Sequence, residues 1–254
     1  DGEGNLHLHA VEGPVNCYCK PDWNRVGIDP EGKCERDVAT GYLSSKQCFK
    51  YGYFEMRAKL PPPGSATDGL GAAWWLWGDD IRCNYTDRQS CWSEIDMFEL
   101  DHHPGMHPHI HIEKKRANGC GRHQMYSLPQ QFTERWPRLD DNQFHTFALE
   151  WTPRTIRFLL DGYVYAERCR TYADDLDPMY IVMSINVNVF TCLSSETTFP
   201  YKWVVDYVRV WQIPGLDEDP SLDIRKHARC KCRKWRKHPY YDTLNRKPPS
   251  CNCR

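Results

Sequence analysis

The sequence predicts an all-β protein built as a β-sandwich or β-barrel. Short runs rich in β-branched and aromatic residues recur between turn signals, and no long segment shows a helical hydrophobic period. Asp161-Gly162, a pair suited to positive φ, separates two alternating runs and predicts a β-hairpin over 155–168. At 254 residues the chain is long enough for one large β domain with a sizeable core.

Nine runs are the candidate strands of this domain. Pro and Gly clusters at 61–69 and 102–108 predict loops near the acidic run at 91–100, where they would shape a cleft. In chain order the runs are LHLHAV (6–11), YGYFEMRAKL (51–60), AAWWLW (72–77), CWSEIDMFEL (91–100), HIHIEK (109–114), FHTFALEW (144–151), TIRFLLDGYVYAER (155–168), MYIVMSINVNVF (179–190) and WVVDYVRVWQ (203–212).

The C-terminal end differs from the rest of the chain in charge. A polar linker follows Trp211, so we place a boundary near Ile213 and expect a β-sandwich domain at 1–213 and a linker with a basic, cysteine-rich module at 214–254. Of the 33 Lys and Arg and 34 Asp and Glu, residues 225–254 hold 11 basic residues and one acidic residue. The rest of the chain keeps 22 basic and 33 acidic residues, so the two parts are opposite in charge.

Four cysteines, Cys230, Cys232, Cys251 and Cys253, bracket the basic end. Two disulfides in one of three pairings would make it a small stapled module, and a metal site is the weaker alternative. Aromatic residues among its cations suit an anionic polymer. If the protein is secreted, a sulfated or carboxylated polysaccharide is favoured over nucleic acid as the ligand of the basic end. Alternatively, the basic end covers the acidic body of the protein by charge complementarity.

The 13 cysteines are scattered along the chain and predict a secreted, extracellular, disulfide-bonded protein. The sequon Asn84-Tyr85-Thr86 agrees with secretion as a glycosylation site. The odd cysteine is free, pairs between chains, or has lost its partner upstream. No run approaches the roughly 18 apolar residues of a membrane span. Since the chain starts at Asp1, we expect a removed signal peptide, and a monomer without membrane or nucleic-acid partners.

The run CWSEIDMFEL places three carboxylates within six positions of a candidate strand. In a regular strand Glu94 and Asp96 face one way and Glu99 faces the other, but a β-bulge at Met97-Phe98 would bring all three to one face. A retaining glycosidase needs two carboxyl groups about 5–5.5 Å apart, and a third can keep the nucleophile ionised. Repulsion among them raises the pKa of one member, which can then act as an acid near neutral pH. The alternatives are a solvated strand face and a calcium site, although calcium prefers a flexible loop.

The run Trp92-Ser93-Glu94-Ile95-Asp96-Met97-Phe98-Glu99 resembles the signature of glycoside hydrolase family 16, in the longer form that carries the bulge. This resemblance implies a concanavalin-like β-jelly-roll sandwich with an open cleft on its concave face. It also implies that Glu94 is the nucleophile, Asp96 its helper and Glu99 the general acid/base. Five more stretches resemble the family in the expected order, at 4–10, 51–61, 72–78, 144–162 and 204–212.

Further residues are candidates for binding the sugar chain. The resemblance implies that Trp75 stacks on a sugar face, although the apolar run around it must also supply core residues. Trp92 is a second candidate. His109 and His111 alternate on the next predicted strand and could reach the acids, with a surface or adventitious metal face as the alternative. Asn186 could hydrogen-bond sugar hydroxyls.

We expect no required cofactor and assign no metal site. In relatives a residue of the last strand, matched here by Asp206, can help to hold a structural calcium ion, so calcium is kept as an alternative.

Together these features predict a secreted, retaining endo-glycosidase that hydrolyses β-linked polysaccharide. Sulfated galactan of the agar, porphyran or carrageenan type fits the longer motif, the histidines and four arginines that could hold sulfates, Arg82, Arg88, Arg116 and Arg122. A glycosaminoglycan is a near variant. The alternatives are an endo-β-1,3-glucanase, a non-catalytic carbohydrate-recognition protein on the same fold, and a structural matrix protein. Recognition proteins of this fold typically lose the catalytic glutamates, and this chain keeps both.

Overall fold

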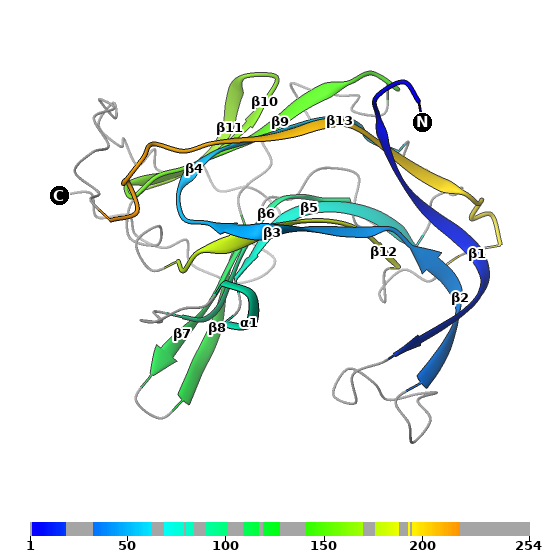
Figure 1. Ribbon diagram of the computed structural model, residues 1–254, viewed down its shortest axis with the longest axis horizontal. Coiled ribbons are helices and arrows are strands. Elements are labelled where there is room, and N and C mark those ends of the chain that lie inside the picture. The colour runs from blue at the N-terminus through cyan, green and yellow to red at the C-terminus, as the bar shows by residue number, and fades with distance from the viewer. Residues whose placement is uncertain are drawn as a thin grey trace, which may run out of the picture.

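The computed structural model shows two antiparallel β-sheets packed face to face (Figure 1). The seven-stranded sheet has the order β11-β10-β9-β4-β13-β1-β2, and the six-stranded sheet has the order β3-β12-β5-β6-β7-β8. The structure describes residues 2–18, 33–61, 69–78, 80–83, 90–100, 109–116, 119–127, 141–169, 176–187, 193 and 195–218.

The elements follow one another along the chain with a single short helix among the described residues. Their bounds are β1 Leu6–Tyr18, β2 Lys33–Thr40, β3 Tyr42–Phe49, β4 Gly52–Lys59, β5 Leu70–Gly78, α1 Asp80–Cys83, β6 Ser90–Glu99, β7 His109–Arg116, β8 Gly119–Ser127, β9 His145–Trp151, β10 Thr155–Leu160, β11 Tyr163–Cys169, β12 Met179–Val187 and β13 Tyr201–Trp211.

Both sheets combine strands that are distant in the sequence. β5 to β8 and β9 to β11 are simple meanders, whereas β12 inserts between β3 and β5, and β13 inserts between β4 and β1. The chain passes from one sheet to the other between β3 and β4, where Tyr51 and Gly52 both have positive φ. A Cβ atom on Gly52 would lie 3.0 Å from the carbonyl oxygen of Trp211, so this crossing requires a glycine.

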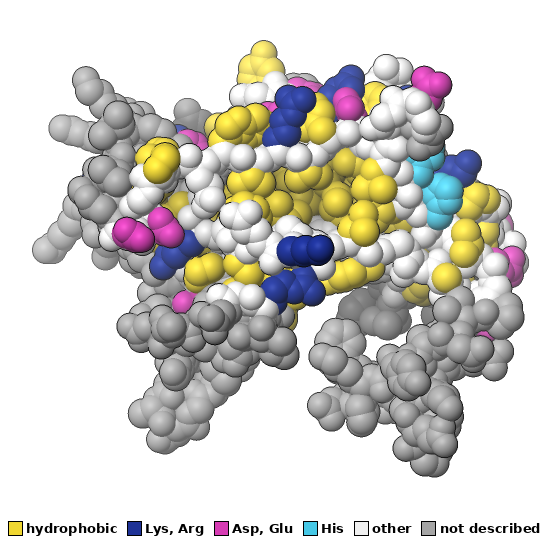
Figure 2. Space-filling view, viewed as in Figure 1, with side chains coloured by type: hydrophobic (Ala, Val, Ile, Leu, Met, Phe, Trp, Pro, Cys, Tyr) yellow, Lys and Arg dark blue, Asp and Glu magenta, His cyan; other side chains and the backbone are white. Residues whose placement is uncertain are grey.

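The hydrophobic core lies between the two sheets. Figure 2 shows apolar side chains filling the space between the layers. The largest fully buried side chains come from both sheets, Trp74 and Phe98 from the six-stranded sheet and Trp151, Trp203 and Phe54 from the seven-stranded sheet. The aromatic residues therefore serve packing to a large extent, as expected for part of the apolar run around Trp75.

The structure confirms the all-β prediction and all nine predicted runs, each of which contains or overlaps a strand. The hairpin is also confirmed, because Asp161 (φ 47°) and Gly162 (φ 78°) both adopt the left-handed conformation between β10 and β11. The sequence missed β2, β3 and β8, which lie at sheet edges. Edge strands carry polar residues on more of their surface, so their alternation of apolar and polar residues is weak.

The sandwich ends with β13 and the short segment that follows it in the described residues. β13 ends at Trp211, and Leu216 still packs into the core with 3% of its surface exposed. The predicted boundary near Ile213 falls between them. The basic, cysteine-rich end and the sequon at 84–86 lie outside the described residues.

One disulfide joins Cys48 in β3 to Cys83 in α1 and holds this helix against the edge of the six-stranded sheet. Figure 1 shows α1 on the side of that sheet that faces away from the seven-stranded sheet. In the part of the chain that the structure describes, no helix is long and apolar enough to cross a membrane.

Candidate active site

The pairing of β6 with β5 decides which face each predicted catalytic acid occupies. Asp96 lies opposite Trp75 and Phe98 lies opposite Trp74, so Met97 has no partner of its own on β5. Met97 is therefore the extra residue of a β-bulge, where the sequence predicted one. Pairing continues beyond the bulge with Glu99 opposite Ala73.

The burial of β6 shows what the bulge does. Ile95, Met97 and Phe98 all lie in the core, so two consecutive residues point inward at the bulge. Glu94, Asp96 and Glu99 then share the opposite side of the six-stranded sheet, which we call the carboxylate face. Simple alternation would have placed Glu99 in the core.

Phe98 anchors the bulge in the core. Its ring centroid lies 5.1 Å from that of Phe147 and 5.7 Å from that of Trp203, both on the opposite sheet. Trp74, its neighbour on β5, is 6.3 Å away. Such tilted and edge-on contacts between rings are the favourable geometries, so the core fixes the inward side of the bulge.

The three carboxyl groups interact with one another. Asp96 is 1% exposed, and burial raises its pKa well above the ordinary value, with a further increase from the negative charge of Glu99. The neighbouring Glu94 side chain lowers the pKa of Asp96, but by less than burial and Glu99 raise it. A raised pKa favours the protonated, neutral form of Asp96.

Two tryptophans of β5 flank the acids on the carboxylate face. Trp75 lies opposite Asp96 and is half-buried, and its Nε1 donates a hydrogen bond to Ser184 Oγ at 3.1 Å. Trp77 lies opposite Glu94, with its ring centroid 5.8 Å from that of Trp75. Sequence reasoning chose Trp75 and missed Trp77, although the two-residue spacing in AAWWLW is a signal for a shared face.

The predicted sugar-binding residues on β6, β7 and β12 are placed by strand register. His111 lies opposite Glu94 and His109 opposite Asp96, and residues opposite one another in an antiparallel pair share a face. Trp92 of β6 lies opposite Glu113 of β7. The side chains of Trp92 and the two histidines lie outside the described part of the structure. Asn186 is exposed at the end of β12, two residues beyond Ser184, and alternation places it on the carboxylate face.

Asp206, the residue matched to a calcium-holding position in relatives, forms an ion pair in this structure. The Nη1 of Arg57 donates to its Oδ2, so a cation already neutralises this carboxylate. Within the described ranges no three His, Cys, Asp or Glu side chains gather closely enough to hold a metal ion.

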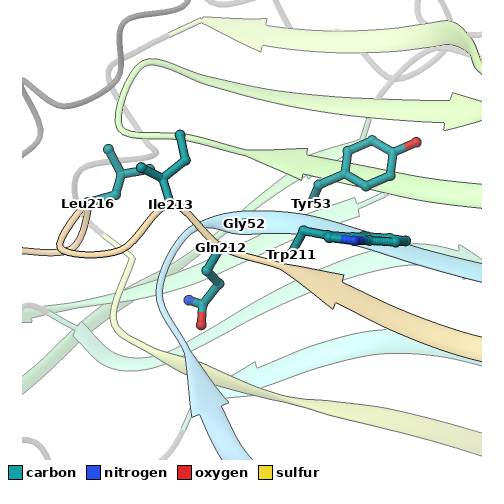
Figure 3. A pocket seen from close by; sticks show the side chains of 6 residues that line it. All are labelled: Gly52, Tyr53, Trp211, Gln212, Ile213 and Leu216. Carbon is teal, nitrogen blue, oxygen red and sulfur yellow. The ribbon is translucent and has the colours of Figure 1, made fainter.

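A depression on the other sheet is separate from these acids. It lies at the ends of β4 and β13, with Tyr53 and Trp211 side by side (Figure 3), and has no acidic residue in its lining. This depression therefore lacks the pair of carboxyl groups that a glycosidase needs. The lining residues are Gly52, Tyr53, Trp211, Gln212, Ile213 and Leu216.

The sequence matches the family model described as glycosyl hydrolases family 16 over residues 31–209, which is more than half of the chain. The chain belongs to glycosyl hydrolases family 16. Membership of family 16 confirms the family to which the sequence was found to be similar, and the stretch at 4–10 lies outside the matched residues. The two packed sheets are accordingly a β-jelly-roll sandwich.

Family 16 relatives include enzymes named for different polysaccharides. EglC of Rhizobium meliloti (strain 1021), an endo-1,3-1,4-beta-glycanase, is 26% identical over 214 residues, which are 83% of this chain and 40% of EglC. The kappa-carrageenase of Pseudoalteromonas carrageenovora is 25% identical over 195 residues, which are 68% of this chain and 46% of that protein. The chain thus spans less than half the length of either relative.

A crystal structure of kappa-carrageenase from Pseudoalteromonas carrageenovora, in complex with an oligotetrasaccharide of kappa-carrageenan, shares the fold. Its TM-score is 0.60 at 20% sequence identity, and the match covers 82% of this chain and 80% of that chain.

Proposed function

We propose that this protein is a retaining endo-glycosidase that hydrolyses β-linked polysaccharide. The observation that carries the proposal is the bulge at Met97, which places Glu94, Asp96 and Glu99 on one face of β6. β6 is the fourth strand of six, so the carboxylate face continues on both sides of the acids. A polymer lying across the strands would be bound on both sides of the cleaved bond, which favours attack within chains.

In the proposed mechanism Glu94 and Glu99 perform two successive displacements. Glu94 attacks the anomeric carbon while Glu99 gives its proton to the glycosidic oxygen, so the bond to the leaving chain breaks and a glycosyl ester forms on Glu94. Glu99, now a carboxylate, takes a proton from water, whose oxygen attacks the same carbon and releases Glu94. Two inversions at one carbon retain the β configuration.

Asp96 supports Glu94 in this mechanism. The raised pKa of Asp96 favours its protonated form, which would donate a hydrogen bond to the Glu94 carboxylate, keep the nucleophile ionised and fix its orientation. The proton stays on Asp96 through both steps. Trp75 and Trp77 offer aromatic faces and edges beside these acids, a suitable surface for sugar rings.

For the substrate we propose a sulfated galactan or a related glycosaminoglycan. The likeness to a kappa-carrageenase supports this choice. Arg82 supports it as well, because its guanidinium lies 4.1 Å from the ring centroid of Tyr180. Tyr180 of β12 lies opposite Trp77 of β5, which in turn lies opposite Glu94 of β6. The Nη1 of Arg82 also donates to Ser44 Oγ at 2.7 Å, which fixes the positive charge beside Tyr180.

An endo-β-1,3-glucanase is the second candidate, supported by the likeness to EglC, an endo-1,3-1,4-beta-glycanase. A neutral glucan would need the tryptophans but not the positive charge of Arg82. Arg82→Gln separates the two, because it should raise KM severalfold for an anionic polysaccharide and leave KM for a glucan unchanged.

We also propose that the protein is a secreted monomer and that its basic end binds anionic polysaccharide. The Cys48–Cys83 disulfide supports secretion, because disulfides persist in oxidising compartments. The opposite charges of the two parts of the chain support a separate binding role for the basic end.

Release of reducing ends from κ-carrageenan, porphyran, agarose, chondroitin sulfate and laminarin tests the proposed function. We expect the intact chain to cleave at least one of them and Glu94→Gln to cleave none. Binding without cleavage by the intact chain would instead identify a carbohydrate-recognition protein.

A further inference from the structure

A second β-bulge lies in β11, at the edge of the seven-stranded sheet. Phe158 of β10 lies opposite Ala166 and Leu159 lies opposite Val164, so Tyr165 is the extra residue. Ala166 is buried in the core and Tyr165 also packs against the core. As at Met97, the bulge turns two consecutive residues inward.

The two bulges are joined by a hydrogen bond across the sandwich. The Tyr165 hydroxyl donates to the main-chain carbonyl oxygen of Met97 at 3.2 Å. Met97 has no partner on β5, and bulges leave main-chain groups outside the regular ladder. Tyr165 thus supplies a donor from the opposite sheet at the residue where β6 departs from regular pairing.

We propose that Tyr165 is a positioning residue for Glu99. This inference rests on the proposed function, in which Glu99 is the acid/base. Glu99 reaches the carboxylate face only through the bulge, and its backbone lies two residues beyond the carbonyl that Tyr165 binds. The regular pattern is re-established directly after Glu99, where the Leu100 N–H donates to the Ala72 carbonyl at 2.9 Å.

The core and Tyr165 hold the bulge in different ways. The aromatic rings around Phe98 hold its side chain in the core and so fix the side of the bulge that faces the core. The Tyr165 hydroxyl fixes the direction of the Met97 peptide. Removing this hydroxyl leaves the ring contact with Phe158 and the core packing, so Tyr165→Phe isolates the hydrogen bond.

Tyr165→Phe tests the proposal, with Tyr163→Phe as the matched control because Tyr163 lies on the same strand and is 58% exposed. We expect Tyr165→Phe to lower kcat on the polysaccharide that the intact chain cleaves by about 10- to 100-fold, with KM changed by less than about twofold. Tyr163→Phe should behave as the unmodified protein.

A substrate whose leaving group departs without a proton does not need Glu99 as an acid. Such a substrate therefore shows whether Tyr165→Phe acts through Glu99. For the dinitrophenyl glycoside of the released oligosaccharide, kcat/KM of Tyr165→Phe should stay close to that of the unmodified protein. A general loss of structure would lower kcat/KM for both substrates equally and would overturn the proposal. So would an unchanged kcat on the polysaccharide.

Amide hydrogen exchange of the peptide covering 93–100 tests the same link without a substrate. We expect faster exchange in Tyr165→Phe than in Tyr163→Phe, confined to this peptide. Equal exchange in the two variants would overturn the proposal even if no polysaccharide were cleaved. Absence of cleavage by the unmodified protein, by contrast, would count against the proposed function alone.

Discussion

Acidic residues on the two sheets of this protein have opposite surroundings. On the outer face of the seven-stranded sheet, the Nη1 of Arg157 lies 3.1 Å from Glu150 Oε2 and its Nη2 lies 3.0 Å from Glu167 Oε1. On the carboxylate face, burial and the charge of Glu99 raise the pKa of Asp96. The first arrangement pairs each acid with a cation, whereas the second buries an acid beside another acid and disfavours its ionised form. The acids of the carboxylate face lie together at a cost to stability, so a catalytic role explains them better than a role in folding.

The largest effect is expected from Glu94→Gln on the carboxylate face. Loss of the nucleophile should lower kcat by about 10⁴-fold or more, because no other group can form the glycosyl ester. Glu150→Gln, which removes an acid from the outer face, should leave kcat unchanged. Reducing-end assays on both variants measure the difference, and full hydrolysis by Glu94→Gln would refute the site assignment.

A large effect on stability is expected from Phe98→Ala, because Phe98 fills the core beneath the bulge. The free energy of unfolding should fall by about 3–5 kcal/mol. Phe144, whose ring lies 4.3 Å from the Arg57 guanidinium on the outer face, is the matched control. Phe144→Ala should cost only about 1 kcal/mol. Urea unfolding gives both values, and similar losses for the two variants would contradict the assignment of Phe98 as the anchor.

The sequence predicted the carboxylate face better than it predicted the edges of the sheets. Strands packed on the core carry alternating or continuous apolar residues, which made β5, β6, β9 and β13 recognisable. The bulge at Met97-Phe98 was predictable because Glu99 would otherwise be buried beside Ile95. The strands β2, β3 and β8 lie at sheet edges and are rich in polar residues, so their sequences show little alternation of apolar and polar residues.

Contacts between distant segments could not be predicted. Tyr165 and Met97 are 68 residues apart, and nothing local to either residue indicates their hydrogen bond. The role of Trp77 was missed for a related reason, since only the register of β5 against β6 places it opposite Glu94. Such pairings depend on how the sheets assemble.

Asp96→Asn sharpens the comparison through its effect on stability. Because the pKa of Asp96 is raised, the folded protein keeps the Asp96 proton above about pH 3.9, whereas the unfolded chain loses it there. The stability of the unmodified protein therefore falls as pH rises from that value to the raised pKa, and the penalty remains above it. A neutral amide avoids this loss, so Asp96→Asn should be more stable than the unmodified protein at neutral pH while its kcat falls. Urea unfolding across this pH range measures the effect, and a gain independent of pH would contradict it.

Asp161→Asn on the outer face should change stability in the opposite direction. Asp161 accepts hydrogen bonds from the Thr146 N–H at 2.8 Å and pairs with His145 Nδ1 at 2.8 Å. Asn tolerates the positive φ of this turn, so the substitution removes charge without straining the backbone. We expect a loss of about 1 kcal/mol in urea unfolding. A gain in stability would show that the outer acids are not held by their partners.

The smallest effect is expected at His145. Burial lowers its pKa, but hydrogen bonds to Asp161 and Asp141 outweigh burial and leave the pKa raised. Its contribution to stability is therefore complete below about pH 6.5 and is lost as pH rises through the raised pKa. His145→Gln should remove this pH dependence, worth less than about 1 kcal/mol, from thermal unfolding measured on either side of that range. An unchanged pH dependence would contradict the pairing.

Proton NMR of the first product tests the central claim most directly. If Glu94 forms a glycosyl ester and Glu99 then activates water, the new reducing end appears first as the β anomer and later equilibrates to α. Initial appearance of the α anomer would show a single displacement. That result would contradict the division of roles among the three acids of β6.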